Sequence, residues 1–163
     1  MNFIKVDLFL RIMAKDAGPD FIGAWSRRER EIRNEEDFGA FYLWLTPKKK
    51  GFCFDDFGYS DISMKILNSE KVDFLKRYAQ DRGGIMSGIR YFGTSGDGQI
   101  YYGKWDSGWK GEGEFMMMRD NEEKEFTEFE KFIARCNALA LNQKLIETRE
   151  RFPYSSLQNA LKS

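Results

Sequence analysis

Three strand-like runs, separated by short turns, are the feature that most constrains the fold of this chain. Each run is apolar and aromatic, as residues in strands commonly are. The segments between the runs are rich in Gly, Ser and Asp, which is the turn chemistry of hairpins. We therefore expect antiparallel neighbours in this part of the chain. The runs are 85–93 (IMSGIRYFG), 98–106 (GQIYYGKWD) and 113–120 (GEFMMMRD).

The glycine-rich stretch FGTSGDGQIYYG (92–103) has three interpretations: a phosphate-binding loop, a metal loop or a tight turn. A phosphate-binding loop needs a helix after its glycines, but a strand-like run follows Gly98 here. A calcium loop needs oxygen ligands at alternate positions, and only Asp97 lies among these glycines. Asp97-Gly98 is a typical hairpin dipeptide, so the pattern predicts a turn.

Helices are expected on both sides of these strands. Apolar residues at helical spacing predict a long helix near 122–150, with Phe126, Phe129, Ile133, Cys136 and Ala140 on one face. Residues 69–84 are predicted as a second helix that Gly83-Gly84 ends. Residues 3–17 fit both a helical and an alternating pattern, and we favour a helix.

The remaining segments complete the predicted fold. Residues 38–58 are predicted as a hairpin, and the charge run 26–37 as a short exposed helix. Together these elements predict one α+β domain over 1–163, with an antiparallel sheet of about five strands, flanking helices and a long C-terminal helix. Residues 1–36 are a candidate peripheral helical extension of this domain.

Composition excludes several classes of function. The chain has no histidine, which removes Ser-His-Asp and Cys-His nucleophile pairs and imidazole metal ligands. Its two cysteines are too few for a structural zinc site, so no metal or cofactor is expected. Lys+Arg and Asp+Glu are both 26, which argues against a dedicated nucleic-acid binder. Without histidine or a metal set, we expect that the protein is not an enzyme. With no secretory signal and no apolar run long enough to span a membrane, we expect it to be cytoplasmic.

The motif YFGTSGDGQIYYGKWD (91–106), followed by a strand and a helix that opens with EFTEFEKFI (125–133), resembles the SUKH superfamily of immunity proteins. Residues 73–84 are similar to a helix of that family that ends in paired glycines. The resemblance covers about residues 70–137 and implies a protein without catalysis, which binds a cognate toxin and blocks its active site. The positions that carry the resemblance are Phe92, Gly93, Gly96, Gly98, Tyr101, Tyr102, Phe126, Phe129 and Phe132.

A partner-binding rim is the candidate site. Tryptophans in a glycine-rich loop are candidate interface anchors, and carboxylates around them would suit a basic cleft such as that of a nuclease toxin. Two other functions stay open: a small nucleic-acid-associated factor that stacks bases on a sheet face, and an enzyme built on the neighbouring carboxylates of Asp55 and Asp56. The sequence does not indicate the oligomeric state. The predicted rim comprises Asp55, Asp56, Trp105, Asp106, Trp109 and Glu112.

Overall fold

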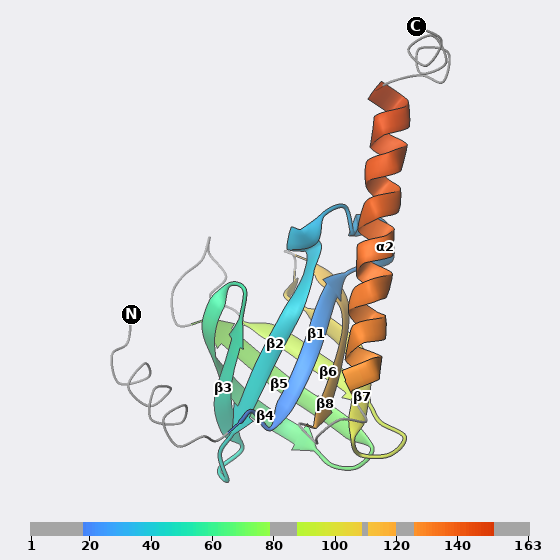
Figure 1. Ribbon diagram of the computed structural model, residues 1–163. Helices are drawn as coiled ribbons and strands as arrows, with labels where there is room; N and C mark the ends of the chain where they lie inside the picture. The colour runs from blue at the N-terminus through green and yellow to red at the C-terminus, as the bar shows by residue number, and fades with distance from the viewer. Residues whose placement is uncertain (1–17, 79–87, 109–110, 120–125, 152–163) are drawn as a thin grey trace, which may run out of the picture.

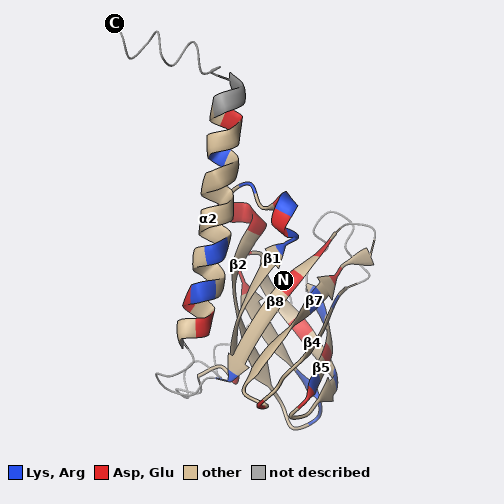
Figure 2. Cartoon of the chain, turned by 90° about the vertical axis from the view of Figure 1, so that its right-hand side faces the viewer, with Lys and Arg blue, Asp and Glu red and all other residues tan. Residues whose placement is uncertain are grey.

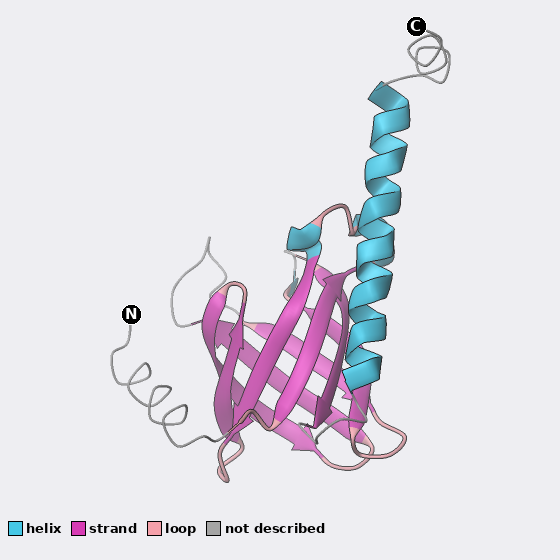
Figure 3. Ribbon diagram, in the orientation of Figure 1, coloured by secondary structure: helices cyan, strands magenta, loops and turns pink. Residues whose placement is uncertain are grey.

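Eight antiparallel strands close into a barrel in the computed structural model, and a long helix lies against the outside of the barrel (Figure 1, Figure 3). The structure describes residues 18–78, 88–108, 111–119 and 126–151. Each strand pairs with its neighbours in sequence, and β1 pairs with β8 to close the barrel. The strands are β1 (Phe21–Arg27), β2 (Phe38–Leu45), β3 (Lys50–Asp55), β4 (Gly58–Leu67), β5 (Lys71–Tyr78), β6 (Ile89–Thr94), β7 (Ile100–Asp106) and β8 (Glu112–Arg119).

The predicted α+β domain with about five strands is therefore wrong. The hairpin within 38–58 and the three strands of the second half are confirmed as β2, β3, β6, β7 and β8. The long C-terminal helix is confirmed as α2 (Phe126–Arg151). The error lies in the segments that form β1, β4 and β5, and these three strands turn an open sheet into a closed barrel.

The helix predicted over 69–84 is strand β5, as far as the structure describes this segment. Val72, Phe74 and Lys76 alternate along β5 and are buried. Of the residues between them, Leu75 is only partly buried, whereas Asp73 is buried and forms an ion pair with Arg90. A lysine on the inner face and a leucine on the outer face hide the alternation that identifies a half-buried strand. The described part of the segment that the family resemblance matches to a helix, residues 73–78, is therefore extended.

Residues 18–36 are not a peripheral helical extension, because β1 is a central part of the barrel wall. The charge run that was predicted as one exposed helix forms two short 3-10 helices, η1 (Glu29–Glu31) and η2 (Glu35–Asp37). Ser26, the first residue of that run, belongs to β1, and Asn34 caps η2 in a capping box with Asp37. The predicted helix at 3–17 lies outside the described residues.

The inner face of the barrel is filled by large side chains. Phe74 and Tyr91 stack with ring centroids 4.8 Å apart, and Phe115 contacts both rings edge to face. An eight-stranded barrel has an interior just wide enough for side chains to fill it. Its buried core consists of Phe21, Trp25, Phe41, Leu43, Cys53, Ile62, Met64, Val72, Phe74, Ile89, Tyr91, Tyr101, Trp105, Phe115 and Met117.

A second core lies between the barrel and α2. Met116 and Met118 point out of β8 toward the helix, while Met117 between them points into the barrel. The three-methionine run is therefore buried on both faces. Phe132 and Cys136 of α2 pack on this outer face, as the predicted stripe requires. Beyond Ala140 the helix runs past the end of the barrel, and Leu141 and Leu145 are exposed (Figure 1).

The glycines of the 92–103 stretch serve the barrel wall and its turn. Gly93 and Gly103 face each other on β6 and β7. A Cβ on Gly103 would lie 2.0 Å from the carbonyl oxygen of Phe92, so only glycine lets the two backbones approach this closely. The predicted Asp97-Gly98 turn is confirmed: Gly98 has a φ of +74°, and the Asp97 carboxylate accepts bonds from two following backbone N–H groups.

Candidate binding site at the loop end of the barrel

One end of the barrel gathers most of the residues with candidate functions. Because adjacent strands are antiparallel, the connections β1–β2, β3–β4 and β7–β8 all lie at the same end, which we call the loop end. It carries η1 and η2 between β1 and β2, as Figure 1 shows. Helix α2 starts near the opposite end, and its charges and those of η1 stand out against the mostly uncharged strands (Figure 2).

A row of aromatic side chains crosses the loop end, and we call it the aromatic row. Trp25 lies at its centre, with its ring 6.2 Å from Trp105 on one side and 5.6 Å from Phe57 on the other. Phe57 in turn contacts Tyr78 at 6.4 Å. Trp105 is fixed by a 2.8 Å hydrogen bond from its Nε1 to the carbonyl oxygen of Ser26. The row therefore joins β1, β5, β7 and the β3–β4 turn into one apolar wall.

A buried ion pair holds the Phe57 end of the aromatic row. The Nζ of Lys76 lies 2.6 Å from Oδ2 of Asp55, and the two side chains are 2% and 0% exposed. The hydroxyl of Tyr78 donates to the same oxygen at 2.7 Å. The other oxygen of Asp55 accepts a 2.9 Å bond from the backbone N–H of Phe57. The Asp55 carboxylate thus ties β3, β5 and the β3–β4 turn together.

Burial changes the proton affinity of the groups around this pair. Burial alone would lower the pKa of Lys76, but Tyr91, Cys53, Asp55 and Tyr78 together raise it above its ordinary value. Burial raises the pKa of the Cys53 thiol to about 12, and it also raises the pKa values of the Tyr78 and Tyr91 hydroxyls. Lys76 therefore stays charged and Cys53 stays protonated near neutral pH.

The acidic cup is a cavity of about 420 Å³ beside the aromatic row. The rings of Trp25 and Phe57 form its apolar part. Glu35 and Glu36 come from η2 and Asp56 from the β3–β4 turn, and all three are exposed. Among the described residues, none of these three carboxylates is in an ion pair. The nearby cations Arg27 and Arg28 are bound to other acids, namely Asp37, Glu31 and Glu112.

Trp25 has a buried polar atom with no hydrogen-bond partner among the described residues. Its side chain is 6% exposed, and its Nε1 makes no hydrogen bond. A Cβ added to Gly39 would lie 3.0 Å from this nitrogen and 2.4 Å from Oδ2 of Asp56. Nε1 therefore faces the same space as the Asp56 carboxylate in the cup. A buried N–H without an acceptor costs free energy, so it is an unusual feature in a folded protein.

The structure brings most of the predicted rim to the loop end but changes the role of its members. Asp56, Asp106 and Glu112 are exposed there, whereas Asp55 is buried in its ion pair with Lys76. Trp105 is 8% exposed and belongs to the core, so it is not an exposed anchor. Glu112 is bound to Arg28. The remaining member of the predicted rim, Trp109, lies outside the described residues.

The carboxylates of Asp55 and Asp56 do not form a pair, because one points into the barrel and the other into solvent. The acid–base site that this doublet suggested is not assembled.

Comparison of the chain with protein-family models, curated proteins and solved structures gave no match. No helix in the described part of the chain is long and apolar enough to cross a membrane. Within the same residues, no group of acids and cysteines is placed to hold a metal ion.

Sequence reasoning missed six members of this site: Trp25, Glu35, Glu36, Phe57, Lys76 and Tyr78. Glu35 and Glu36 belong to a charge run that is typical of a solvated helix face, and their role depends on where η2 packs. Trp25 and Lys76 lie on strands that the sequence did not reveal. The order Asp55-Asp56-Phe57-Gly58 was the available signal, because Asp and Gly are typical turn residues, and in the structure Gly58 has a positive φ.

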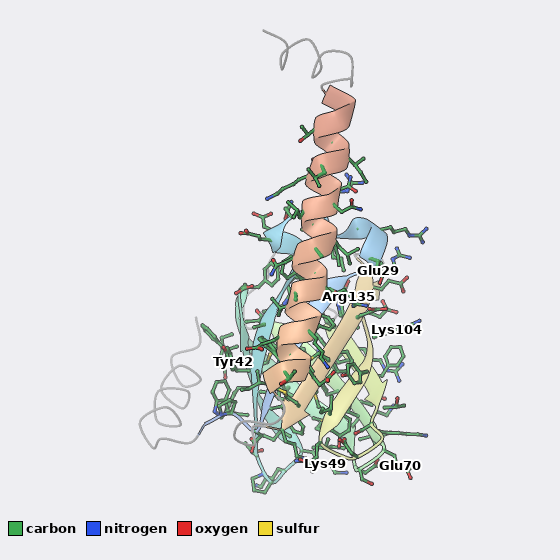
Figure 4. The ribbon with its side chains drawn as sticks, turned by 45° about the vertical axis from the view of Figure 1, so that its right-hand side comes forward. Glu29, Tyr42, Lys49, Glu70, Lys104 and Arg135 are labelled. Carbon is green, nitrogen blue, oxygen red and sulfur yellow. The ribbon has the colours of Figure 1, made fainter. Side chains whose placement is uncertain are left out.

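A second hollow of about 350 Å³ lies where α2 crosses β7 and β8. The polar and charged side chains around it bind one another. Tyr102 donates a hydrogen bond to Glu128 at 2.9 Å, and Arg135 binds Glu114. Arg135 also reaches Glu29 of η1, and Figure 4 shows these two side chains close together. These contacts attach the helix to the barrel and explain the hollow as part of that attachment.

Proposed function

We propose that this protein is a non-catalytic binding protein that holds a partner protein at the loop end of its barrel. The observation that carries the proposal is the convergence of exposed carboxylates and aromatic rings at this end. Asp56, Asp106, Glu35 and Glu36 are exposed around the aromatic row. The packed interior makes the barrel a rigid support for these groups.

Charge indicates the kind of partner. Exposed carboxylates attract a basic surface over long range and speed its association, and aromatic side chains contribute most of the contact energy at interfaces. A protein with a cationic, substrate-binding cleft would be attracted by these carboxylates and could make contact with the aromatic side chains. The resemblance to immunity proteins supplies one such partner, a toxin that acts on nucleic acid in the cytoplasm. In this proposal the loop end blocks the cleft of that toxin.

The test uses the protein encoded next to this one in the genome as the partner. Both proteins are purified, and their association and dissociation rates are measured by biolayer interferometry at low and high salt. We expect Asp56→Asn with Asp106→Asn to slow association, and more strongly at low salt. Glu70→Gln is the matched control, since Glu70 is an exposed acid at the opposite end of the barrel (Figure 4).

Two results would contradict the proposal. The toxin is not the partner if the neighbouring protein does not bind. The same holds if cells that express the neighbouring protein are not protected by co-expression of the protein described here. If Glu70→Gln weakens binding and the loop-end double variant does not, the binding surface lies elsewhere on the barrel.

The outer wall of β2 and β3 favours a second candidate, binding of single-stranded nucleic acid. Tyr42 and Phe54 lie opposite each other on this wall and are 40% and 42% exposed. The rings of Phe52 and Tyr59 stack next to them at 5.7 Å. Bases stack on such aromatic platforms. Anisotropy of a labelled oligothymidine should then rise with protein, should weaken steeply between about 50 and 200 mM salt, and should respond to Tyr42→Ala.

A further inference from the structure

We propose that the acidic cup binds an arginine side chain of the partner. The inference rests on the proposed function only in that the partner protein supplies the arginine. The cup is formed by Trp25, Glu35, Glu36, Asp56 and Phe57, and its chemistry can be tested without knowing that partner.

The charge of the cup selects a cation. Its three carboxylates are exposed and come from two separate connections, η2 and the β3–β4 turn. The Arg27 and Arg28 side chains nearby are engaged with Asp37, Glu31 and Glu112, so they do not neutralise the cup. A cation that enters the cup gains the attraction of all three carboxylates.

The aromatic part of the cup selects a planar cation. The rings of Trp25 and Phe57 line the cavity and are tilted by 44° to each other. Phe57 is 42% exposed and Trp25 only 6%, so Phe57 supplies the open aromatic face. A guanidinium group stacks on an aromatic face and binds carboxylates with two parallel hydrogen bonds. The ammonium group of lysine is a compact, strongly hydrated point charge and does neither as well. These walls therefore favour arginine over lysine.

The unpartnered Nε1 of Trp25 indicates that the ligand also carries an acceptor. A guanidinium has only donors, so it cannot satisfy this N–H. A peptide that bears the arginine has backbone carbonyls next to the side chain, and one of them can accept from Nε1. Because Nε1 and Asp56 Oδ2 face the same space above Gly39, the carbonyl and the guanidinium would bind side by side.

The cup can be tested by NMR with the peptide acetyl-Gly-Arg-Gly-amide as the probe. The indole N–H signals of the four tryptophans are recorded during the titration, and the Trp25 signal is assigned by its loss in Trp25→Phe. We expect that signal to move downfield as the peptide binds. The lysine analogue should bind several-fold more weakly, and the uncharged citrulline analogue should not bind.

Two variants test the contacts of the cup. Glu35→Gln/Glu36→Gln/Asp56→Asn replaces exposed acids by amides of the same shape, and it should weaken peptide binding at least about tenfold. Gly39→Ala should also abolish binding, because its methyl group would occupy the space between Trp25 Nε1 and Asp56 Oδ2. Glu70→Gln should leave binding unchanged.

The possible outcomes separate this inference from the proposed function. Equal binding of the arginine and citrulline peptides, or a Trp25 signal that does not move, would overturn the cup as an arginine site. The proposed function would still stand if the double variant Asp56→Asn with Asp106→Asn slows association of the partner protein. Conversely, arginine binding with no association of the neighbouring protein would support the cup and overturn the toxin as the partner.

Discussion

Replacing Lys76 by methionine should destabilise the barrel strongly. Methionine keeps most of the length of the side chain but removes the positive charge that faces Asp55 at 2.6 Å. Asp55 is 0% exposed, so its carboxylate would stay buried without a counter-charge. Removing one partner of a buried ion pair costs about 3–5 kcal/mol. For a domain of this size, that loss lowers the melting temperature by roughly 6–20 °C.

The assay is equilibrium unfolding in urea, followed by tryptophan fluorescence. The matched control is Lys131→Met, which removes the lysine of an exposed ion pair with Glu128 and should leave the unfolding midpoint nearly unchanged. The triple variant Lys76→Met/Asp55→Val/Tyr78→Phe removes the whole polar group and should recover most of the lost stability, because well-packed apolar residues often replace a buried pair at little cost. If Lys76→Met costs less than about 1 kcal/mol, or if the triple variant is no more stable than the single one, the reasoning is wrong.

Three further predictions concern the barrel and its helix. The Cys53 thiol, with its pKa raised to about 12 from 9.0, keeps its proton in the folded state after the unfolded state has lost it. Stability should therefore be full below pH 9.0 and should fall by about 1.4 kcal/mol per pH unit above it, and Cys53→Ala should remove that part of the slope in urea titrations. Phe132→Ala should cost about 3 kcal/mol of unfolding free energy, whereas Leu145→Ala, on the exposed part of α2, should cost less than about 0.5. Gly103→Ala should cost roughly 2 kcal/mol or more because its methyl group meets the Phe92 carbonyl, whereas Gly96→Ala, with open space around it, should leave the melting temperature unchanged.

The sequence predicts the strands of this barrel where apolar and aromatic runs are bounded by turn residues. This holds for β6 and β7, which Asp97-Gly98 joins, and for the hairpin of β2 and β3. It also holds for α2, whose stripe at three- and four-residue spacing packs on β8. In each case the local pattern agrees with the environment that the fold supplies.

The strands that the sequence did not reveal have an environment that hides the pattern. β1 is covered by the barrel interior on one face and by α2 on the other, so Ala24 and Trp25 are both buried and no alternation remains. On β5, Lys76 replaces an apolar residue because Asp55 on another strand neutralises it. Such pairings form between distant segments, and a single sequence does not show them. Closure of the barrel follows from these strands and was missed for the same reason.

The candidate site was predictable in part. Asp56, Asp106 and Glu112 reach the same end of the barrel because each lies at a strand end, and alternating strand directions bring those ends together. The burial of Asp55 and Trp105 was not predictable, because it depends on which face of each strand turns inward. A one-residue change in that assignment moves every side chain to the other face.

The buried pair and the acidic cup are connected through one hydrogen bond, which makes a final prediction possible. Asp55 accepts from the backbone N–H of Phe57 at 2.9 Å, and Phe57 forms one wall of the cup. Lys76 and Tyr78 hold the other oxygen of Asp55 and thereby fix the position of this acceptor. The polar group inside the barrel is therefore expected to position the cup, in addition to its effect on stability.

The triple variant Lys76→Met/Asp55→Val/Tyr78→Phe separates these two effects. It should fold with nearly normal stability, yet Phe57 would have no side-chain acceptor to hold its backbone N–H. We expect it to bind acetyl-Gly-Arg-Gly-amide about tenfold more weakly, although all three carboxylates of the cup are intact. The measurement is the same titration of the Trp25 indole signal, made beside urea unfolding of the same sample. A variant that is stable and binds the peptide as well as the original protein would show that the buried pair stabilises the barrel without positioning the cup.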